Sequence, residues 1–143
     1  MTVIAWDGKT LAADKLGNYN GLGRTVTKIH RIGDLLVGVA GNAWVANELL
    51  VWVERGRKPK DFPACQRDKD DGSMMLVIED RQTLLYERSP YPTRTADGTC
   101  AIGSGRDFAL AAMHMGADAR RAVEVATHFC PDCGLGVDCL EAP

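Results

Sequence analysis

The second residue of the chain is a threonine, whose hydroxyl could act as a nucleophile. The small side chain of Thr2 is compatible with removal of the preceding initiator methionine, Met1. Removal leaves a free α-amine beside the hydroxyl, and such an amine has an ordinary pKa of about 7.7–8.0. Near neutral pH this amine can take the proton of its own hydroxyl. The start of the chain therefore allows nucleophilic attack by Thr2.

Two charged residues further along the chain could support this chemistry. A cation near the amine disfavours its ammonium form, and Lys28 could supply that cation from a neighbouring strand. Asp14 could then hold the lysine in place. A Thr, an Asp and a Lys on three strands are usually ordinary sheet residues, so these residue types do not establish a site by themselves.

The first hairpin decides whether these residues can meet. Residues 2–6 and 10–14 flank Asp7-Gly8-Lys9, which is a strong turn signal. A three-residue loop would place Thr2 opposite Asp14, with both side chains on one face of the sheet. A two-residue Asp-Gly turn would place Thr2 opposite Ala13 and turn Asp14 to the other face. The sequence leaves both registers open.

The rest of the chain predicts consecutive hairpins and grouped helices. A Gly- and Asn-rich loop over 15–23 is followed by a hairpin of 25–32 with 35–40, and by a helix from the N-cap Asn42 to about Arg55. A loop over 56–72 precedes a hairpin of 74–78 with 83–86, a strand over 99–102, helices over 106–115 and 119–129, and a strand over 134–140. Asp118 is expected to cap the last helix, and Ser104 with Asp107 is spaced like a capping box for the helix before it. This order indicates one α+β layered domain over residues 1–143.

Composition excludes several classes of protein. A net charge of −2 gives no electrostatic reason to expect nucleic acid or an anionic membrane as partner. No apolar run approaches the roughly 20 residues of a membrane-spanning helix. The N-terminus lacks the pattern of a secretion signal, so a cytoplasmic location is expected. The five cysteines are an odd number, which argues against a closed disulfide framework.

Five short motifs resemble one known family in their order and spacing. They are Thr2-Val-Ile-Ala, Leu11-Ala-Ala-Asp14, Thr27-Lys28-Ile29, Leu36-Val-Gly38-Val-Ala-Gly41 and Ile102-Gly-Ser104-Gly105. The set resembles HslV peptidase and proteasome β subunits, which are N-terminal nucleophile hydrolases, over nearly the whole chain. The resemblance implies a four-layer αββα sandwich of two antiparallel sheets. It also implies a threonine endopeptidase that assembles into homo-oligomeric rings.

The resemblance assigns a role to each matching residue. Thr2 becomes the nucleophile and its α-amine the general base, Lys28 tunes that base, and Asp14 pairs with Lys28. The N–H of Gly38 becomes the oxyanion donor, and Ser104 the hydrogen-bond partner of the terminal amine. Leu36 and Ala40 could line the substrate pocket.

The sequence departs from the family pattern in two places. The family has a second long helix after the first, and residues 56–72 are too short and polar to contain it, so this helix is expected to be shortened or missing. Near the C-terminus the family's acidic residue aligns with Cys130 and its serine with Cys133. This CxxC, with Cys139 as a third thiol, could bind zinc, cycle redox, or consist of free thiols. No cofactor is expected, apart from a structural cation that the backbone near Cys130–Cys133 could bind.

The resemblance also implies partners. The substrate would be a peptide or an unfolded protein, and the family usually works with an ATP-driven unfoldase. The chain has no P-loop, so such an ATPase would be a separate protein. Two other functions stay open: a catalytically silent ring or scaffold protein of the same fold, and an amide hydrolase for small molecules.

Overall fold

The computed structural model describes residues 1–64 and 72–143. Two antiparallel sheets form its centre. The first has the order β10-β1-β2-β11 and consists of β1 (Ile4–Trp6), β2 (Thr10–Asp14), β10 (Cys100–Ile102) and β11 (Val137–Glu141). The second has the order β5-β6-β7-β8-β9 and consists of β5 (Ile29–Ile32), β6 (Leu35–Ala40), β7 (Met74–Glu79), β8 (Gln82–Tyr86) and β9 (Thr93–Arg94).

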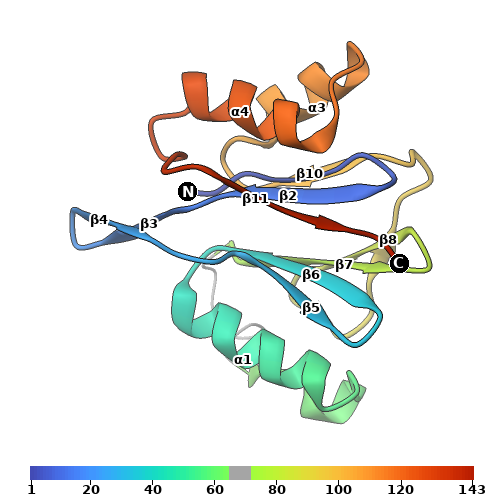
Figure 1. The fold of residues 1–143 in the computed structure, drawn as a ribbon. Helices are drawn as coiled ribbons and strands as arrows, with labels where there is room; N and C mark the ends of the chain where they lie inside the picture. The colour runs from blue at the N-terminus through green and yellow to red at the C-terminus, as the bar shows by residue number, and fades with distance from the viewer. Residues whose placement is uncertain (65–71) are drawn as a thin grey trace.

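Helices cover the outer face of each sheet. Figure 1 shows α3 (Arg106–His114) and α4 (Ala119–Phe129) above the first sheet, and α1 (Ala43–Glu54) below the second. The order of layers is therefore helix, sheet, sheet, helix. The predicted αββα sandwich of two antiparallel sheets is confirmed.

The expected shortening of the second helix after α1 concerns residues 56–72. Part of this segment, 65–71, lies outside the described residues. The described residues just before it contain the short 3-10 helix η1 (Pro59–Asp61). The shortened or missing helix therefore stays a prediction.

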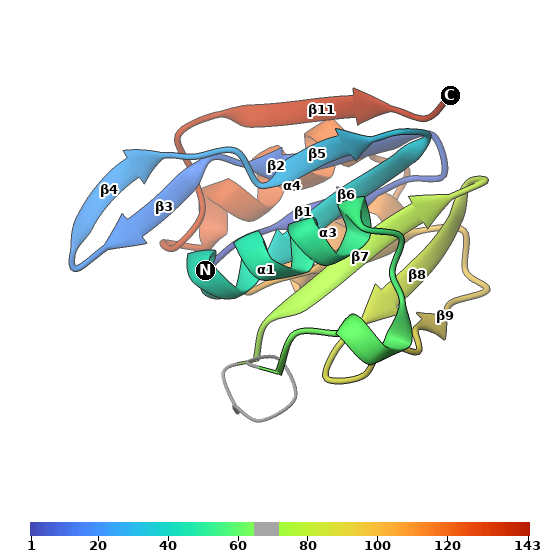
Figure 2. The same cartoon turned by 90° about the horizontal axis from the view of Figure 1, so that it is seen from below.

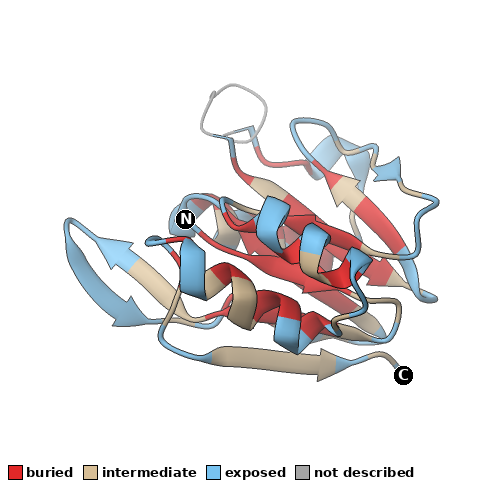
Figure 3. Cartoon of the chain, turned by 90° about the horizontal axis from the view of Figure 1, so that it is seen from above, coloured by how far each residue is buried: buried red, intermediate tan, exposed pale blue. Residues whose placement is uncertain are grey.

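Three layers of buried side chains hold the sandwich together. Val3 and Ala5 face α3 and α4, where the small residues of α4 let the helix pack close to the sheet. Ile4 and Trp6 point the other way, into the core between the two sheets. A third cluster joins the second sheet to α1. The alternation of Val3 to Trp6 between two cores is what a strand buried on both faces requires, and Figure 3 shows this burial through the central strands.

Several elements follow directly from local sequence signals. Asp118 caps α4, because its side chain accepts a hydrogen bond from the N–H of Arg121 at 2.8 Å. The turn between β7 and β8 consists of Asp80 and Arg81, both with positive φ. These elements confirm the predicted helix start and the predicted third hairpin.

The prediction of a loop over residues 15–23 is wrong. These residues form most of an additional hairpin of β3 (Leu16–Tyr19) and β4 (Leu22–Thr25), which projects from one end of the sandwich in Figure 2. Asn20 and Gly21 form its turn with φ of 53° and 86°. Asn-Gly is the preferred pair for a two-residue turn with positive φ at both positions. The signal was present in the sequence, and the neighbouring glycines obscured it.

The register of the first hairpin matches neither of the two registers predicted from the sequence. Ile4 pairs with Ala13 and Trp6 with Leu11, so the turn consists of Gly8 and Lys9 rather than a three-residue loop or an Asp-Gly turn. The Asp7 carboxylate accepts hydrogen bonds from the N–H groups of Lys9 and Thr10 at 2.9 and 2.8 Å, which fixes this turn. Gly8 has a φ of 97°, as the first position of a type II′ turn requires.

Candidate active site

A buried lysine joins the N-terminal residues at one end of the sandwich. The Lys28 Nζ donates to Thr2 Oγ1 at 3.1 Å, to Asp14 Oδ1 at 2.8 Å and to the carbonyl oxygen of Met1 at 3.2 Å. The exposed fractions of Thr2, Asp14 and Lys28 are only 4%, 0% and 9%. The structure therefore brings together the nucleophile, the cation and the carboxylate predicted from the sequence.

Asp14 fixes this arrangement because its carboxylate has four donors. Oδ1 accepts from Lys28 Nζ and from the N–H of Val3 at 3.0 Å. Oδ2 accepts from the N–H groups of Leu16 at 3.2 Å and Gly134 at 3.0 Å. A fully buried carboxylate is stable only when its charge is paired and its oxygens are hydrogen-bonded, and here both conditions are met.

The observed register alone would not place Asp14 near Thr2. Asp14 lies opposite Val3, since its N–H donates to the Val3 carbonyl at 3.1 Å, and Val3 faces the helices. Asp14 is the last residue of β2, however, and Lys28 precedes the first residue of β5. Because both residues lie at strand ends, the long Lys28 side chain can extend past the edge of the strand and contact the Asp14 carboxylate. The site therefore depends on where the strands end as well as on their alternation.

Ser104 contacts the nitrogen of the proposed nucleophile. The N–H of Thr2 donates to Ser104 Oγ at 3.1 Å, and the N–H of Gly105 donates to the Thr2 carbonyl at 3.1 Å. The predicted capping box is wrong, because Gly105 is the N-cap of α3 and no side chain makes a cap hydrogen bond there. The Ser104 hydroxyl is directed to Thr2 instead of to the helix.

Gly103 is a site residue that the sequence analysis did not assign. Its φ is 95°, and a Cβ at this position would clash with the carbonyl oxygen of Thr2. Only glycine therefore lets this turn lie against the N-terminal strand and direct Ser104 to the Thr2 nitrogen. The available signal was the Gly103-Ser104-Gly105 run after a short strand. Gly134, which donates to Asp14, had no comparable signal in the sequence.

The structure does not support Gly38 as the oxyanion donor. Gly38 lies in the middle of β6, paired with Ile29 on one side and Leu76 on the other, so its backbone belongs to the sheet. A Cβ at Gly38 would lie 3.0 Å from a methyl carbon of Ile4. The glycine is needed because the two sheets approach closely at this point.

Leu36 and Ala40 also lie elsewhere than predicted. Both belong to the core between the sheets, and Leu36 is 0% exposed, so it cannot contact a substrate in this chain. The alternation of β6 directs both side chains inward. A cavity of about 480 Å³ lies beside the end of β6, because Met74, the partner of Ala40, is among its lining residues. The residues that line this cavity come from the β7–β9 side of the sandwich, and none of them belongs to β6.

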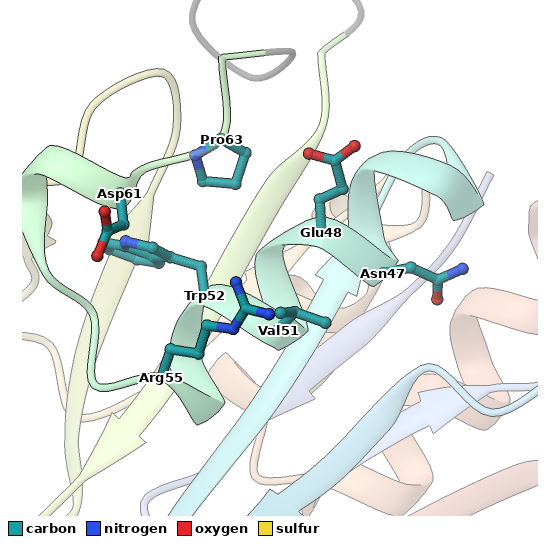
Figure 4. Close-up of a pocket in the computed structure, with 7 residues that line it drawn as sticks. All are labelled: Asn47, Glu48, Val51, Trp52, Arg55, Asp61 and Pro63. Atoms are coloured by element: carbon teal, nitrogen blue, oxygen red, sulfur yellow. The ribbon is translucent and has the colours of Figure 1, made fainter.

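A second cavity is remote from Thr2. Figure 4 shows its lining residues on α1 and on the segment that follows it: Asn47, Glu48, Val51, Trp52, Arg55, Asp61 and Pro63. Its volume is about 370 Å³. It contains none of the residues that contact Lys28 and lies on the opposite side of the second sheet, so it is not part of the candidate active site.

Two cysteines lie behind Ser104. Cys130 and Cys133 are buried, their sulfur atoms are 3.3 Å apart, and the Ser104 Oγ lies 3.7 and 3.9 Å from them. Burial would raise the pKa of the Cys130 thiol, but hydrogen bonds from Cys133 and Ser104 outweigh it and lower that pKa. Burial, helped by the hydrogen bond to Cys130 and the charge of Asp14, raises the pKa of the Cys133 thiol to about 12. Cys130 is thus the more acidic thiol of the pair.

The described part of the chain contains no set of side chains that could bind zinc. Within residues 1–64 and 72–143, no group of three or more His, Cys, Asp or Glu side chains could hold a metal ion. Within the same residues, no helix is long and apolar enough to span a membrane.

The comparison with solved structures identifies the fold. The chain has the fold of the N-terminal nucleophile hydrolases of the proteasome β and HslV type. HslV from Trypanosoma brucei superposes with a TM-score of 0.74 at 23% identity, covering 98% of this chain and 97% of that chain. Thiobacillus denitrificans BPH in complex with epoxomicin gives 0.71 at 23% identity, with 100% of both chains covered. A second structure of BPH gives 0.68 at 24% identity, covering 100% of this chain and 99% of that chain.

Comparison of the whole sequence with family models and with curated proteins does not detect this relationship. No family model matches the sequence, and no curated protein matches it. The similarity therefore lies in the arrangement of the whole chain and in a few short motifs around the site.

Proposed function

We propose that this protein is a threonine peptidase whose nucleophile is Thr2 after removal of Met1. The observation that supports this proposal is the Lys28 ammonium, which lies 3.1 Å from the Thr2 hydroxyl and 2.8 Å from the buried Asp14 carboxylate. A buried cation beside a threonine hydroxyl at the start of a chain suits an N-terminal nucleophile better than it suits a structural role.

The free α-amine of Thr2 begins the reaction as the base. It accepts the hydroxyl proton while Oγ1 attacks the carbonyl carbon of the substrate. The proton then passes to the departing amine, the peptide bond breaks, and an ester links the substrate to Thr2. Water, activated by the same amine, hydrolyses the ester and restores the hydroxyl. Lys28 favours the neutral amine by its charge, and Ser104 orients the nitrogen through its hydroxyl.

The oxyanion requires a backbone donor at the edge of the site. Gly41 suits this role better than Gly38, because it is exposed and directly follows the last residue of β6. The N–H of Val39 donates to the carbonyl of Lys28 at 3.2 Å, so the end of β6 lies beside the residue that contacts Thr2. A Cβ at Gly41 would clash with Ser73, so this position requires glycine as well.

Met1 acts as a block on this chemistry. While it is attached, the Thr2 nitrogen is an amide and cannot act as a base. The Met1 carbonyl also accepts a hydrogen bond from Lys28 at 3.2 Å. A chain that keeps Met1 would have the site geometry without activity, which is the silent scaffold alternative.

Assembly into a homo-oligomeric ring is part of the proposal. HslV-type proteases form rings, and the helical layer of this chain exposes apolar side chains that a neighbour could cover. Phe108 and Phe129, for example, stack with their ring centroids 5.5 Å apart and are 40% and 62% exposed. Light scattering of the purified protein measures the mass of the ring, and replacement of Phe129 by Ser is expected to weaken the assembly.

We further propose an unfolded protein as substrate and a separate ATP-dependent unfoldase as partner.

The test compares chains that begin at residue two. Protein released from a cleavable N-terminal fusion, so that Thr2 is first, should hydrolyse short fluorogenic peptides. Thr2→Ala in the same format should reduce kcat/KM by about 10³-fold or more, because it removes the nucleophile. Thr2→Ser keeps a hydroxyl beside the amine and serves as the matched control, with measurable activity retained. Intact mass verifies that Met1 is absent in each sample.

Two outcomes would contradict the proposal. Equal rates for Thr2→Ala and the unaltered processed chain would remove Thr2 from the mechanism. Hydrolysis of small amides but of no peptide of any length would favour the small-molecule amide hydrolase.

A further inference from the structure

The segment after α4 brings two thiols together beside the candidate active site. α4 ends at Phe129, Cys130 is its C-cap, and the N–H of Cys133 donates to the carbonyl of Cys130 at 3.2 Å. This turn places the two sulfur atoms 3.3 Å apart, with the Cys133 S–H directed to Cys130. Free thiols at this separation need only a small movement to form a bond.

The surroundings of the pair favour oxidation at Cys130 first. The hydrogen bonds from Cys133 and Ser104 that lower the pKa of Cys130 increase its thiolate fraction, and the thiolate is the reactive form. Cys133 lies next to Cys130 as the resolving thiol. Cys130 and Cys133 are 6% and 5% exposed, but Ser104, which lies against both sulfur atoms, is exposed. We therefore expect a small oxidant to approach from the side of Ser104.

Two hydrogen-bond routes connect this pair to the Thr2 site. The first runs from the sulfur atoms to the Ser104 hydroxyl and from there to the Thr2 nitrogen at 3.1 Å. The second runs through the residue after Cys133, because the N–H of Gly134 donates to Asp14 Oδ2 at 3.0 Å. Asp14 in turn holds Lys28 at 2.8 Å. A movement of the CxxC turn would therefore change the contacts of both the Thr2 nitrogen and Lys28.

We propose that Cys130 and Cys133 form a redox-active dithiol that hydrogen peroxide converts into a disulfide, and that this disulfide loosens the Thr2 site. The Cys130 sulfur attacks a peroxide oxygen, the O–O bond breaks, and a sulfenic acid forms with loss of one water. The Cys133 sulfur then attacks the Cys130 sulfur, the S–O bond breaks, and a second water leaves. Two thiols thus lose two hydrogens while hydrogen peroxide becomes two waters.

The effect on the site follows from the contacts that oxidation removes. The S–H groups disappear, and the sulfur atoms move toward each other and away from their present places beside Ser104. Gly105 packs closely against the turn, since a Cβ on it would lie 3.3 Å from the Cys133 sulfur. We expect the turn to shift as the bond forms, because the two sulfur atoms must approach from 3.3 Å to about 2.0 Å. Movement of Gly134 weakens its hydrogen bond to Asp14. The regulatory effect on catalysis rests on the proposed peptidase function, whereas the disulfide itself does not.

The first experiment measures the disulfide directly. Reduced protein is treated with hydrogen peroxide, alkylated, digested and analysed by mass spectrometry. The peptide containing Cys130 and Cys133 should lose two hydrogens and escape alkylation, and dithiothreitol should reverse both changes. Cys133→Ser, of similar size, should form no such bond, and Cys139→Ser, the matched control outside the pair, should behave like the unaltered chain. Absence of the intramolecular disulfide in the unaltered chain overturns the proposal.

The second experiment measures the coupling without relying on catalysis. Amide hydrogen exchange at Gly134 should become about fivefold faster in the oxidised protein, which corresponds to the loss of about one hydrogen bond. If the disulfide forms and this exchange rate is unchanged, the coupling to the site is refuted.

The third experiment separates this proposal from the proposed function. Peptide hydrolysis by the processed chain should fall about fivefold on oxidation, recover on reduction, and be insensitive to peroxide in Cys133→Ser. If the reduced processed chain has no peptidase activity, the proposed function fails, and disulfide formation and Gly134 exchange still decide this proposal. If the reduced chain is active and oxidation leaves its rate unchanged, the regulatory effect is refuted.

Discussion

The buried pair of Asp14 and Lys28 makes a sharp prediction about stability. Asp14→Asn keeps the shape of the side chain and removes its charge. The amide has one oxygen in place of two, so its NH2 group would face N–H donors that Asp14 now accepts, such as those of Leu16 and Gly134. Lys28, 9% exposed, would lose its counter-ion. Removing one partner of a buried pair costs about 3–5 kcal/mol, a large part of the roughly 5–15 kcal/mol of a typical domain.

Equilibrium unfolding in urea measures this cost. With a slope of about 2 kcal/mol/M, the midpoint should fall by roughly 2 M without a change in slope. Lys28→Met should cost less than Asp14→Asn, because Asp14 would keep its three backbone donors. The double variant should be about 1–3 kcal/mol more stable than the sum of the two single changes predicts.

A matched control is available at the surface. Asp138 pairs with Lys15 at 3.4 Å, and both side chains are about one-third exposed, at 31% and 30%. Asp138→Asn should therefore change the free energy of unfolding by less than about 1 kcal/mol. A loss of less than 1 kcal/mol for Asp14→Asn, or additive costs in the double variant, would refute the reasoning about the buried pair.

Three further predictions follow from single positions. Gly103→Ala should destabilise the protein by about 1–3 kcal/mol and abolish peptide hydrolysis, because the new methyl group clashes with the Thr2 carbonyl. Unfolding and kinetic assays measure the two effects, and retained activity would contradict the prediction. Because burial raises the pKa of Cys133 to about 12, the folded state holds this proton longer than the unfolded chain. The free energy of unfolding should therefore fall as pH rises above about 9, more steeply in the unaltered chain than in Cys133→Ser, and identical pH slopes would refute this. Gly38→Ala should lower the free energy of unfolding by about 1–3 kcal/mol, because the new methyl group overpacks against Ile4. Adding Ile4→Val should restore part of this loss, as measured by thermal unfolding. An unchanged stability of Gly38→Ala would contradict the close approach of the sheets.

Local sequence signals predicted most of the secondary structure. Asp118 at the start of α4 is such a signal, because its side chain satisfies a backbone N–H within one helical turn. The hairpin of β3 and β4 was missed although Asn20-Gly21 gives an equally local signal. The other glycines of this segment favour a loop, but the sequence contained the information for the hairpin.

The resemblance to a known family supplied the candidate residues, and packing determined which of them lie at the site. Thr2, Asp14, Lys28 and Ser104 are in contact as a group. The family motif in β6 also matches at Gly38, Leu36 and Ala40. However, β6 is a central strand, so the backbone of Gly38 is paired in the sheet and the side chains of Leu36 and Ala40 are buried in the core.

The sequence by itself determined the types of the reacting groups, the positions of most turns and helix ends, and the order of the elements. All of these depend on residues close together in the chain. Only the tertiary structure decided the register of the first hairpin, the reach of Lys28 to Asp14, and the contact between Ser104 and the Thr2 nitrogen across 102 residues. The physical reason is that a strand's partner and its end point are set by the packing of two sheets and their helices, so no local pattern specifies them.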